Sequence, residues 1–180
     1  MRQSSKAALG GIVSALSIVI MLCTYISPLL VYTAPPFAGI LLILIINELG
    51  YKWAFGTFAS ISLLSVFLIA DKESAVFYTM FFGYYPILVL FLQSKIKSKI
   101  FKYIIKIIIC NIACISAVMV CAFVFNISYD DFSEGGILFT LAFIVLMNIL
   151  FIVFDFFVLR IQDVYILKLR KKFRKLFNIR

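Results

Sequence analysis

Six long apolar runs alternate with short polar segments along the chain. A helix that crosses a bilayer needs about 20 apolar residues, within a range of about 17–25, and most of these runs have that length. The pattern therefore predicts an all-α integral membrane protein, built as a bundle of six transmembrane helices. The predicted spans are Ala7–Ile26, Pro36–Leu49, Trp53–Ala70, Ala75–Leu92, Ile100–Phe125 and Ile137–Leu159.

The second run is shorter than the others, and Pro35 and Pro36 stand at its beginning. Proline suits the first turn of a helix, where a missing N–H costs nothing, so we expect the helix to start there. If the second and third runs instead formed a re-entrant hairpin, the segments before and after them would lie on the same sides of the membrane as with two full crossings. Glu48 and Lys52 at the intervening turn favour full crossings, because charges in mid-bilayer are costly.

The distribution of charge predicts the orientation. Of the 17 basic residues, all but Lys72 fall on one side of the predicted spans, and the loops on the other side carry acidic residues. Because Lys and Arg concentrate on cytoplasmic flanks, we expect both termini to lie inside. The sequence thus predicts a six-span transmembrane domain over residues 1–163 and a basic cytoplasmic tail over residues 164–180.

Composition supports a membrane protein and excludes several chemistries. The chain is 64% hydrophobic and 14% charged, against about 45–50% and about 25% in soluble domains. The net charge of +9 flanks apolar runs, so we do not expect nucleic acid as a partner. The chain has no histidine and no G-x-x-x-x-G-K-[ST] loop, which excludes His-based hydrolysis and P-loop ATP hydrolysis. We predict no enzyme activity, no cofactor and no metal.

Polar residues inside the predicted spans are the first functional candidates. Asp155, near the inner end of the sixth run, and Lys106, about two turns into the fifth, approach from the same side. They are expected to pair, either as a structural ion pair or as a proton or ion relay. Asn111 and Asn148 lie near mid-membrane. Side-chain amides there either bridge helices or line a ligand cavity.

The segment FFGYYPILVLF, Phe81–Phe91, interrupts the fourth span. Gly83 and Pro86 free backbone groups and are expected to bend the helix. The hydroxyls of Tyr84 and Tyr85 then stand at the bend, where they are candidates for a pocket wall.

Two longer outer connections are expected. Ser27–Gly39 is uncharged and rich in proline, whereas Asn126–Gly136 is acidic. Each is either a lid over an outward-facing site or an ordinary connector.

The tail combines apolar and basic residues at helical spacing. Ile166, Leu169, Phe173 and Leu176 share one face, which predicts an amphipathic helix lying on an anionic leaflet; a protein-binding motif is the alternative. The residues expected to bind lipid are Lys168, Arg170, Lys171, Lys172, Arg174 and Lys175.

Small residues recur every fourth position at the start of the first span, at Ala7, Gly11 and Ala15. Helices in lipid associate mainly through close approach at small residues. This face either packs against the chain's own helices or docks a separate membrane protein.

With this small face, the sequence AGILLILIINELGYKWAFGTFASISLLSVFL (Ala38–Leu68) and six predicted spans, the chain resembles the substrate-binding S-components of energy-coupling factor (ECF) transporters. Gly11 departs from the alanine pattern of that family but remains small. The resemblance also rests on the long loop expected after the first span. It covers most of the chain without identifying a vitamin-specific subfamily.

The resemblance implies a function. S-components of the bacterial plasma membrane bind a small nutrient from outside, under the first loop and between spans four, five and six. They dock through small residues of span one onto a transmembrane coupling protein with two ATPase subunits. By position, the implied substrate-binding residues are Tyr25, Tyr32, Tyr78, Tyr84, Tyr85, Asn111, Ser116, Thr140 and Asn148. Their character suits a flat, largely uncharged, vitamin-like ligand. The alternative is a non-catalytic structural protein of the cell envelope, similar to the MreD group.

Overall fold

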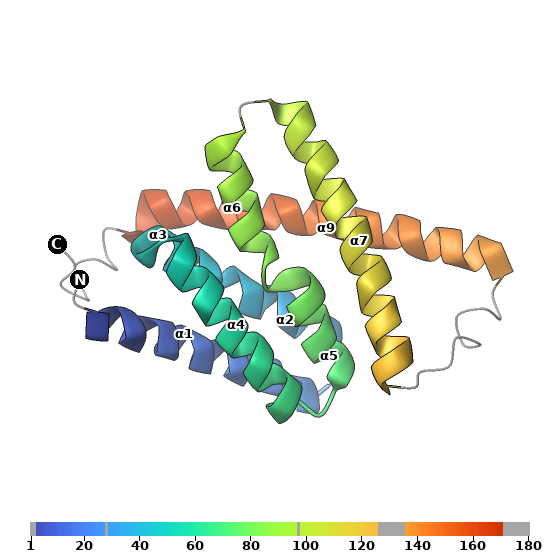
Figure 1. Cartoon of the computed structure of the whole chain (residues 1–180), viewed down its shortest axis with the longest axis horizontal. Helices are drawn as coiled ribbons and strands as arrows, with labels where there is room; N and C mark the ends of the chain where they lie inside the picture. Colours follow the sequence, from blue (N-terminus) through green and yellow to red (C-terminus); the bar gives the residue numbers. More distant parts are fainter. Residues whose placement is uncertain (1–2, 28, 97, 126–135, 171–180) are drawn as a thin grey trace.

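The structure is a computed structural model, and it describes residues 3–27, 29–96, 98–125 and 136–170. These residues are helical throughout, apart from short turns, and no strand occurs among them. The elements, shown in Figure 1, are α1 (Gln3–Leu22), η1 (Cys23–Tyr25), α2 (Leu30–Ile40), α3 (Leu42–Leu49), α4 (Tyr51–Leu68), α5 (Lys72–Phe77), η2 (Tyr78–Phe82), α6 (Tyr85–Lys95), α7 (Lys99–Phe125), α9 (Gly136–Val164) and η3 (Tyr165–Leu169).

Four helical segments are long and apolar enough to cross a membrane: Gln3–Tyr25, Leu30–Leu49, Tyr51–Leu68 and Lys72–Lys95. They correspond to the first four predicted spans. The fifth and sixth apolar runs fall in α7, of 27 residues, and α9, of 29 residues. Large apolar side chains on the surface, such as Phe67 at 76% exposure, suit contact with lipid. The all-helical membrane-protein class agrees with the sequence, whereas the six-span count and the orientation of the termini stay predictions.

The predicted start of the second span is wrong. The helix begins at Leu30, and Pro35 and Pro36 lie inside α2. The long loop expected over Ser27–Gly39 is therefore wrong as well, because most of it is helix. A proline fixes φ near the helical value, so the helix accommodates both rings at the loss of two backbone hydrogen bonds.

The α-helix of the fourth span is interrupted where the sequence predicts a bend. After α5 the backbone widens into the π-helical η2, in which the Gly83 N–H donates to the carbonyl of Tyr78 at 2.7 Å. A turn follows, and Pro86 stands in the first turn of α6. Since proline has no N–H, it cannot donate to the Phe82 carbonyl four residues earlier. Gly39 of α2 lies against that carbonyl: a Cβ built on Gly39 would overlap the Phe82 oxygen.

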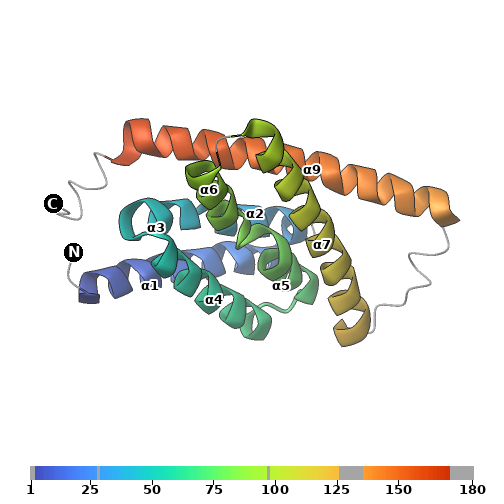
Figure 2. The same cartoon turned by 45° about the horizontal axis from the view of Figure 1, so that its top comes forward.

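The core joins elements that are far apart in sequence. One apolar cluster combines Leu9 and Val13 of α1 with residues of α3, α6, α7 and α9, while a second surrounds Tyr78 with residues of α1 to α4. Figure 2 shows α9 along one side of the molecule, with α2 and α6 between it and α1, and with α4 crossing α1. In both views the start of α1, the α3–α4 corner and the end of α9 lie at the same end (Figures 1 and 2).

The corner between α3 and α4 is made by one residue, Gly50. Its φ is 89°, and its N–H donates to the carbonyls of Ile45 and Ile46, both at 3.1 Å. Only glycine adopts this region without strain.

We expect Gly50→Ala to destabilise the protein by about 1–3 kcal/mol, the cost of holding a side chain in that backbone region. Thermal unfolding in detergent measures the change. Gly56→Ala in the middle of α4 is the matched control, because a Cβ there meets nothing within 4 Å. Equal unfolding temperatures for the two variants would contradict the expectation.

Candidate functional site

The small residues of α1 divide into two rows. Gly10, Ser14 and Ser17 are buried against neighbouring helices, and the Ser17 hydroxyl donates to the Ala38 carbonyl of α2 at 3.3 Å. The row singled out by its four-residue spacing, with Ala7 at its start and Gly11 in its middle, is exposed. A Cβ on Gly11 would meet nothing within 4 Å. The row that packs against the chain's own helices is therefore not the predicted one, and docking of a partner by the exposed row stays a prediction.

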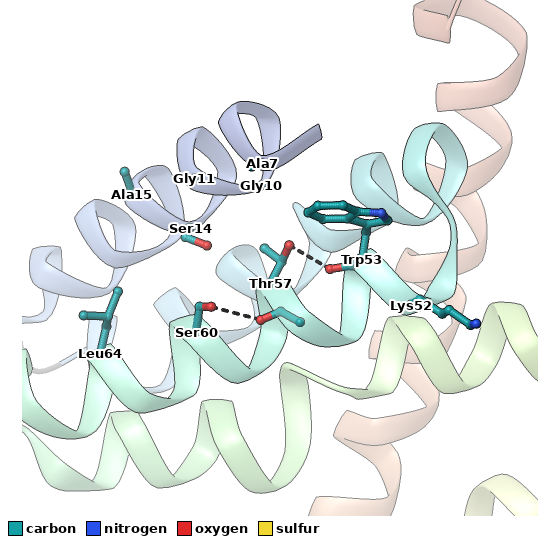
Figure 3. Close-up of a pocket in the computed structure, with 11 residues that line it drawn as sticks. Ala7, Gly10, Gly11, Ser14, Ala15, Lys52, Trp53, Thr57, Ser60 and Leu64 are labelled. Atoms are coloured by element: carbon teal, nitrogen blue, oxygen red, sulfur yellow. Dashed lines mark hydrogen bonds between the residues drawn. The ribbon is translucent and has the colours of Figure 1, made fainter. Parts of the chain in front are cut away.

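The exposed row forms one wall of a groove between α1 and α4 (Figure 3). The cavity has a volume of about 680 Å³. Small residues line both walls, and the larger side chains stand toward the ends. The lining residues are Ala7, Gly10, Gly11, Ser14, Ala15, Lys52, Trp53, Gly56, Thr57, Ser60 and Leu64.

The two hydroxyls that α4 contributes to the groove are satisfied within that helix. Thr57 donates to the carbonyl of Trp53 at 2.9 Å, and Ser60 donates to the carbonyl of Gly56 at 3.0 Å. A Cβ on Gly10 would lie 3.3 Å from the Thr57 oxygen, so α1 and α4 already approach closely at the floor. The groove thus exposes backbone and small side chains, the surface on which a further helix packs in lipid. No acid–base pair lines it.

One end of the groove has a different character. Lys52 and Trp53, at the start of α4, stand there, and Figure 3 shows the indole extending from α4 toward the start of α1. Tryptophan and lysine are typical of the interface between membrane and water. The groove therefore runs from a polar end at the α3–α4 corner into the apolar part of the bundle.

Tyr25 and Tyr32, predicted to bind substrate, lie on the surface with exposed fractions of 59% and 58%. The Tyr25 hydroxyl donates to the Leu68 carbonyl at 3.4 Å and accepts the Ala70 N–H at 3.1 Å. The Tyr32 hydroxyl donates to Glu73 at 3.3 Å. Tyr25 thus contacts the end of α4 and the connection that follows it, whereas Tyr32 contacts the first turn of α5. The role of both tyrosines toward a substrate stays a prediction.

The tyrosines around the helix break point in different directions. Tyr84 packs edge-on against Phe58 of α4. Tyr85 is buried, and its ring packs on Phe151 of α9. Tyr78 is fully buried, and its hydroxyl has no hydrogen-bond partner within the described part of the chain.

The mid-membrane amides bridge two helices. Asn111 of α7 and Asn148 of α9 donate to one another, each at 3.3 Å, so the bridging alternative is the one the structure contains. The Ser116 hydroxyl donates to the Ala113 carbonyl of its own helix at 2.9 Å. The side chain of Thr140 lies outside the described residues.

The expected pairing of Lys106 with Asp155 is confirmed. The ammonium lies 2.7 Å and 3.0 Å from the two carboxylate oxygens, and both side chains are almost completely buried. The Tyr85 hydroxyl also donates to Asp155, at 2.5 Å. This third member was not predicted as part of the pair. The only sequence signal for the role of Tyr85 is the neighbouring Pro86, because this proline fixes where α6 begins.

The C-terminal segment binds back onto α3. Arg170, predicted to contact lipid, forms an ion pair with Glu48, its Nε 3.3 Å from the carboxylate. The helix runs on from α9 into the π-helical η3 without a break at the predicted domain boundary. Lys168 is exposed, and lipid binding by it stays a prediction. The expectation for Lys171, Lys172, Arg174 and Lys175 falls outside the described residues.

Comparison with known proteins adds no relative to this picture. No protein-family model, no curated protein and no solved structure matches the chain. The groove between α1 and α4, the buried polar contacts and the break in the fourth span are therefore the features from which a function is inferred.

Proposed function

We propose that this protein is the membrane-embedded substrate-binding subunit of an ECF-type nutrient transporter in a bacterial plasma membrane. In this role it docks through the α1–α4 groove onto a transmembrane coupling protein that carries two ATPase subunits. It binds a small, vitamin-like molecule from outside and is not itself an enzyme. The observation that carries the proposal is the exposure of Gly11 and its neighbours along an open groove.

An open groove of this kind suits a partner helix for a physical reason. Lipid chains are as apolar as leucine, so burial of apolar area contributes little to association, and close packing of backbones contributes most. The chain places Gly11 and Gly56 on facing helices, and a Cβ on either would meet nothing within 4 Å. Two glycines with open space in front of them leave room for another helix to approach.

The substrate-binding half of the proposal draws on the fourth span. Discontinuous helices that line the middle of a bundle commonly form substrate sites in transporters. The hydroxyls of Ser74, Tyr78 and Thr79 are buried there and make no hydrogen bond within the described residues. A neutral ligand with several hydrogen-bonding groups would satisfy them.

A structural membrane protein of the cell envelope is the second candidate, and one observation favours it. Three of the residues expected to bind substrate, Tyr85, Asn111 and Asn148, are engaged in contacts between helices. The long loop that contributed to the resemblance is also mostly helix. A scaffold needs such internal contacts and no ligand.

Gly11→Leu is expected to weaken docking at least about tenfold, a loss of about 1.4 kcal/mol or more, because the leucine fills the groove. Binding of the purified variant to the reconstituted coupling protein and ATPases, measured in detergent or nanodiscs, tests this. Val19→Leu is the matched control, since Val19 is 56% exposed on the same helix and does not line the groove. Unchanged docking by Gly11→Leu would refute the proposed use of the groove.

A separate experiment distinguishes the two candidate functions. Small molecules that purify with the protein are identified by mass spectrometry and then tested for thermal stabilisation of the protein freed of ligand. The transporter subunit is expected to yield a molecule that raises the unfolding temperature. Failure to find one, with recovery of envelope proteins and no ATPase module in pull-downs, would favour the scaffold.

A further inference from the structure

The last turn of α3 is tied to the end of the chain by a buried carboxylate. The Glu48 side chain is completely buried, and its oxygen accepts hydrogen bonds from the Tyr165 hydroxyl at 3.1 Å and from Arg170 Nε at 3.3 Å. These partners stand more than 115 residues further along the sequence. A buried carboxylate needs such partners, because it loses its hydration on folding.

A second pair reinforces this connection. Asn47, next to Glu48, and Gln162, on the last turns of α9, exchange two amide hydrogen bonds at 2.7 Å and 3.0 Å. Asn47 also donates to the carbonyl of Ile43 within α3. The end of α9 and η3 therefore holds two consecutive residues of α3 at fixed positions.

The tied residues stand next to the polar end of the groove. Only Gly50 separates α3 from α4, and its N–H caps α3 while its carbonyl accepts the Ala54 N–H of α4. The two helices also pack against each other, so the position of α3 is coupled to that of α4. Lys52 and Trp53, which line the groove, are the second and third residues of α4.

We propose that Glu48 is a positioning residue for partner docking. The C-terminal segment braces the α3–α4 corner through Glu48, and the brace fixes where Lys52 and Trp53 stand at the mouth of the groove. The consequence for docking rests on the proposed function, whereas the brace itself is a property of this chain alone. Arg170 of the basic tail does not line the groove. It contributes to docking indirectly, through its ion pair with Glu48.

Trp53 is the only tryptophan in the chain, so its fluorescence reports on the mouth of the groove without a label. Arg170→Gln is expected to shift Trp53 emission to longer wavelength and to increase its quenching by acrylamide. Arg160→Gln is the matched control: Arg160 is exposed on α9, ten residues earlier in sequence, and its guanidinium lies over the Phe156 ring. Equal emission and quenching in both variants and the parent would overturn the brace.

Tyr165→Phe is a second test of the brace, for the case in which Arg170→Gln does not fold. It removes one hydroxyl from Glu48 and keeps the buried ring, so the protein retains its packing and a smaller shift in the same direction is expected. A Trp53 signal unchanged by Tyr165→Phe, in a protein that elutes normally from size exclusion, would count against the brace as well.

Docking measurements separate the two proposals. In the same binding assay, Arg170→Gln is expected to weaken docking about tenfold, equivalent to ~1.4 kcal/mol, and Arg160→Gln to leave it unchanged. If Gly11→Leu has no effect on docking, the groove is not the docking site, and the Trp53 measurements still test the brace. If Gly11→Leu prevents docking and Arg170→Gln does not weaken it, the positioning role of Glu48 is refuted alone.

Discussion

Lys106→Met is expected to destabilise the protein by about 3–5 kcal/mol, the cost of removing one member of a buried ion pair. The variant leaves the Asp155 carboxylate buried between α6, α7 and α9, with the Tyr85 hydroxyl as its remaining partner in the described contacts. Unfolding by heat or by denaturant in detergent measures the loss. The matched control is Lys102→Met, one turn earlier on α7 and only partly buried, which is expected to stay within about 0.5 kcal/mol.

The double variant Lys106→Met with Asp155→Leu distinguishes a structural pair from a relay. Replacing a buried ion pair by apolar residues of similar size is often neutral or stabilising, so most of the lost stability is expected to return. If the double variant is stable, binds partner and ligand, and supports uptake, the pair is structural. Recovered stability with abolished uptake would instead assign the relay function.

Gly39→Ala is expected to destabilise the protein by about 2 kcal/mol, an overpacking cost near the upper end of its usual range less the gain in helix propensity. The methyl group overlaps the Phe82 carbonyl oxygen, with the carbonyl carbon 3.0 Å away, and overpacking of this kind costs about 1–3 kcal/mol and occasionally more. Alanine gains about 1 kcal/mol over glycine from helix propensity. The overlap costs more than the propensity gain because the Phe82 carbonyl belongs to the backbone, which cannot rotate away as a side chain does.

Gly11→Ala is the matched control for Gly39→Ala. Both residues are helical glycines, but a Cβ on Gly11 meets nothing within 4 Å, so the propensity gain is expected to appear without a clash. Thermal unfolding of the two variants is compared in the same detergent. An unfolding temperature for Gly39→Ala at or above that of the parent would show that α2 and η2 are not in the close contact described.

Some of the candidate site could be predicted from the sequence, and the reason is local. Lys106 and Asp155 are charged residues at matching depths in two apolar runs, and burial leaves each needing the other. Gly83 lacks a Cβ and Pro86 lacks an N–H, so the sequence indicated a disturbance of the helix in the fourth span without tertiary information. Tyr85 could not be added in this way, because its contact with Asp155 depends on the direction in which α6 leaves the break.

Other expectations failed or stayed open because they depend on packing. Pro36 as a helix start was wrong, since a helix tolerates interior prolines when its surroundings hold it together. Arg170 carries the same charge as its neighbours in the tail, and only the position of Glu48 at the end of α3 makes it an ion-pair partner. A pattern of basic residues does not reveal which one reaches a buried carboxylate.

The sequence by itself determined the membrane class, the helical composition and the small-residue row on α1, because hydropathy and spacing along one helix are local properties. The tertiary structure alone decided that Gly10 and Ser14 face inward while Gly11 faces an open groove. That choice depends on where α4 crosses α1, which is set by contacts such as that between Gly10 and Thr57. Gly10 is buried and the adjacent Gly11 is exposed. Which of the two faces inward depends on the rotation of α1 about its axis, and only packing fixes that rotation.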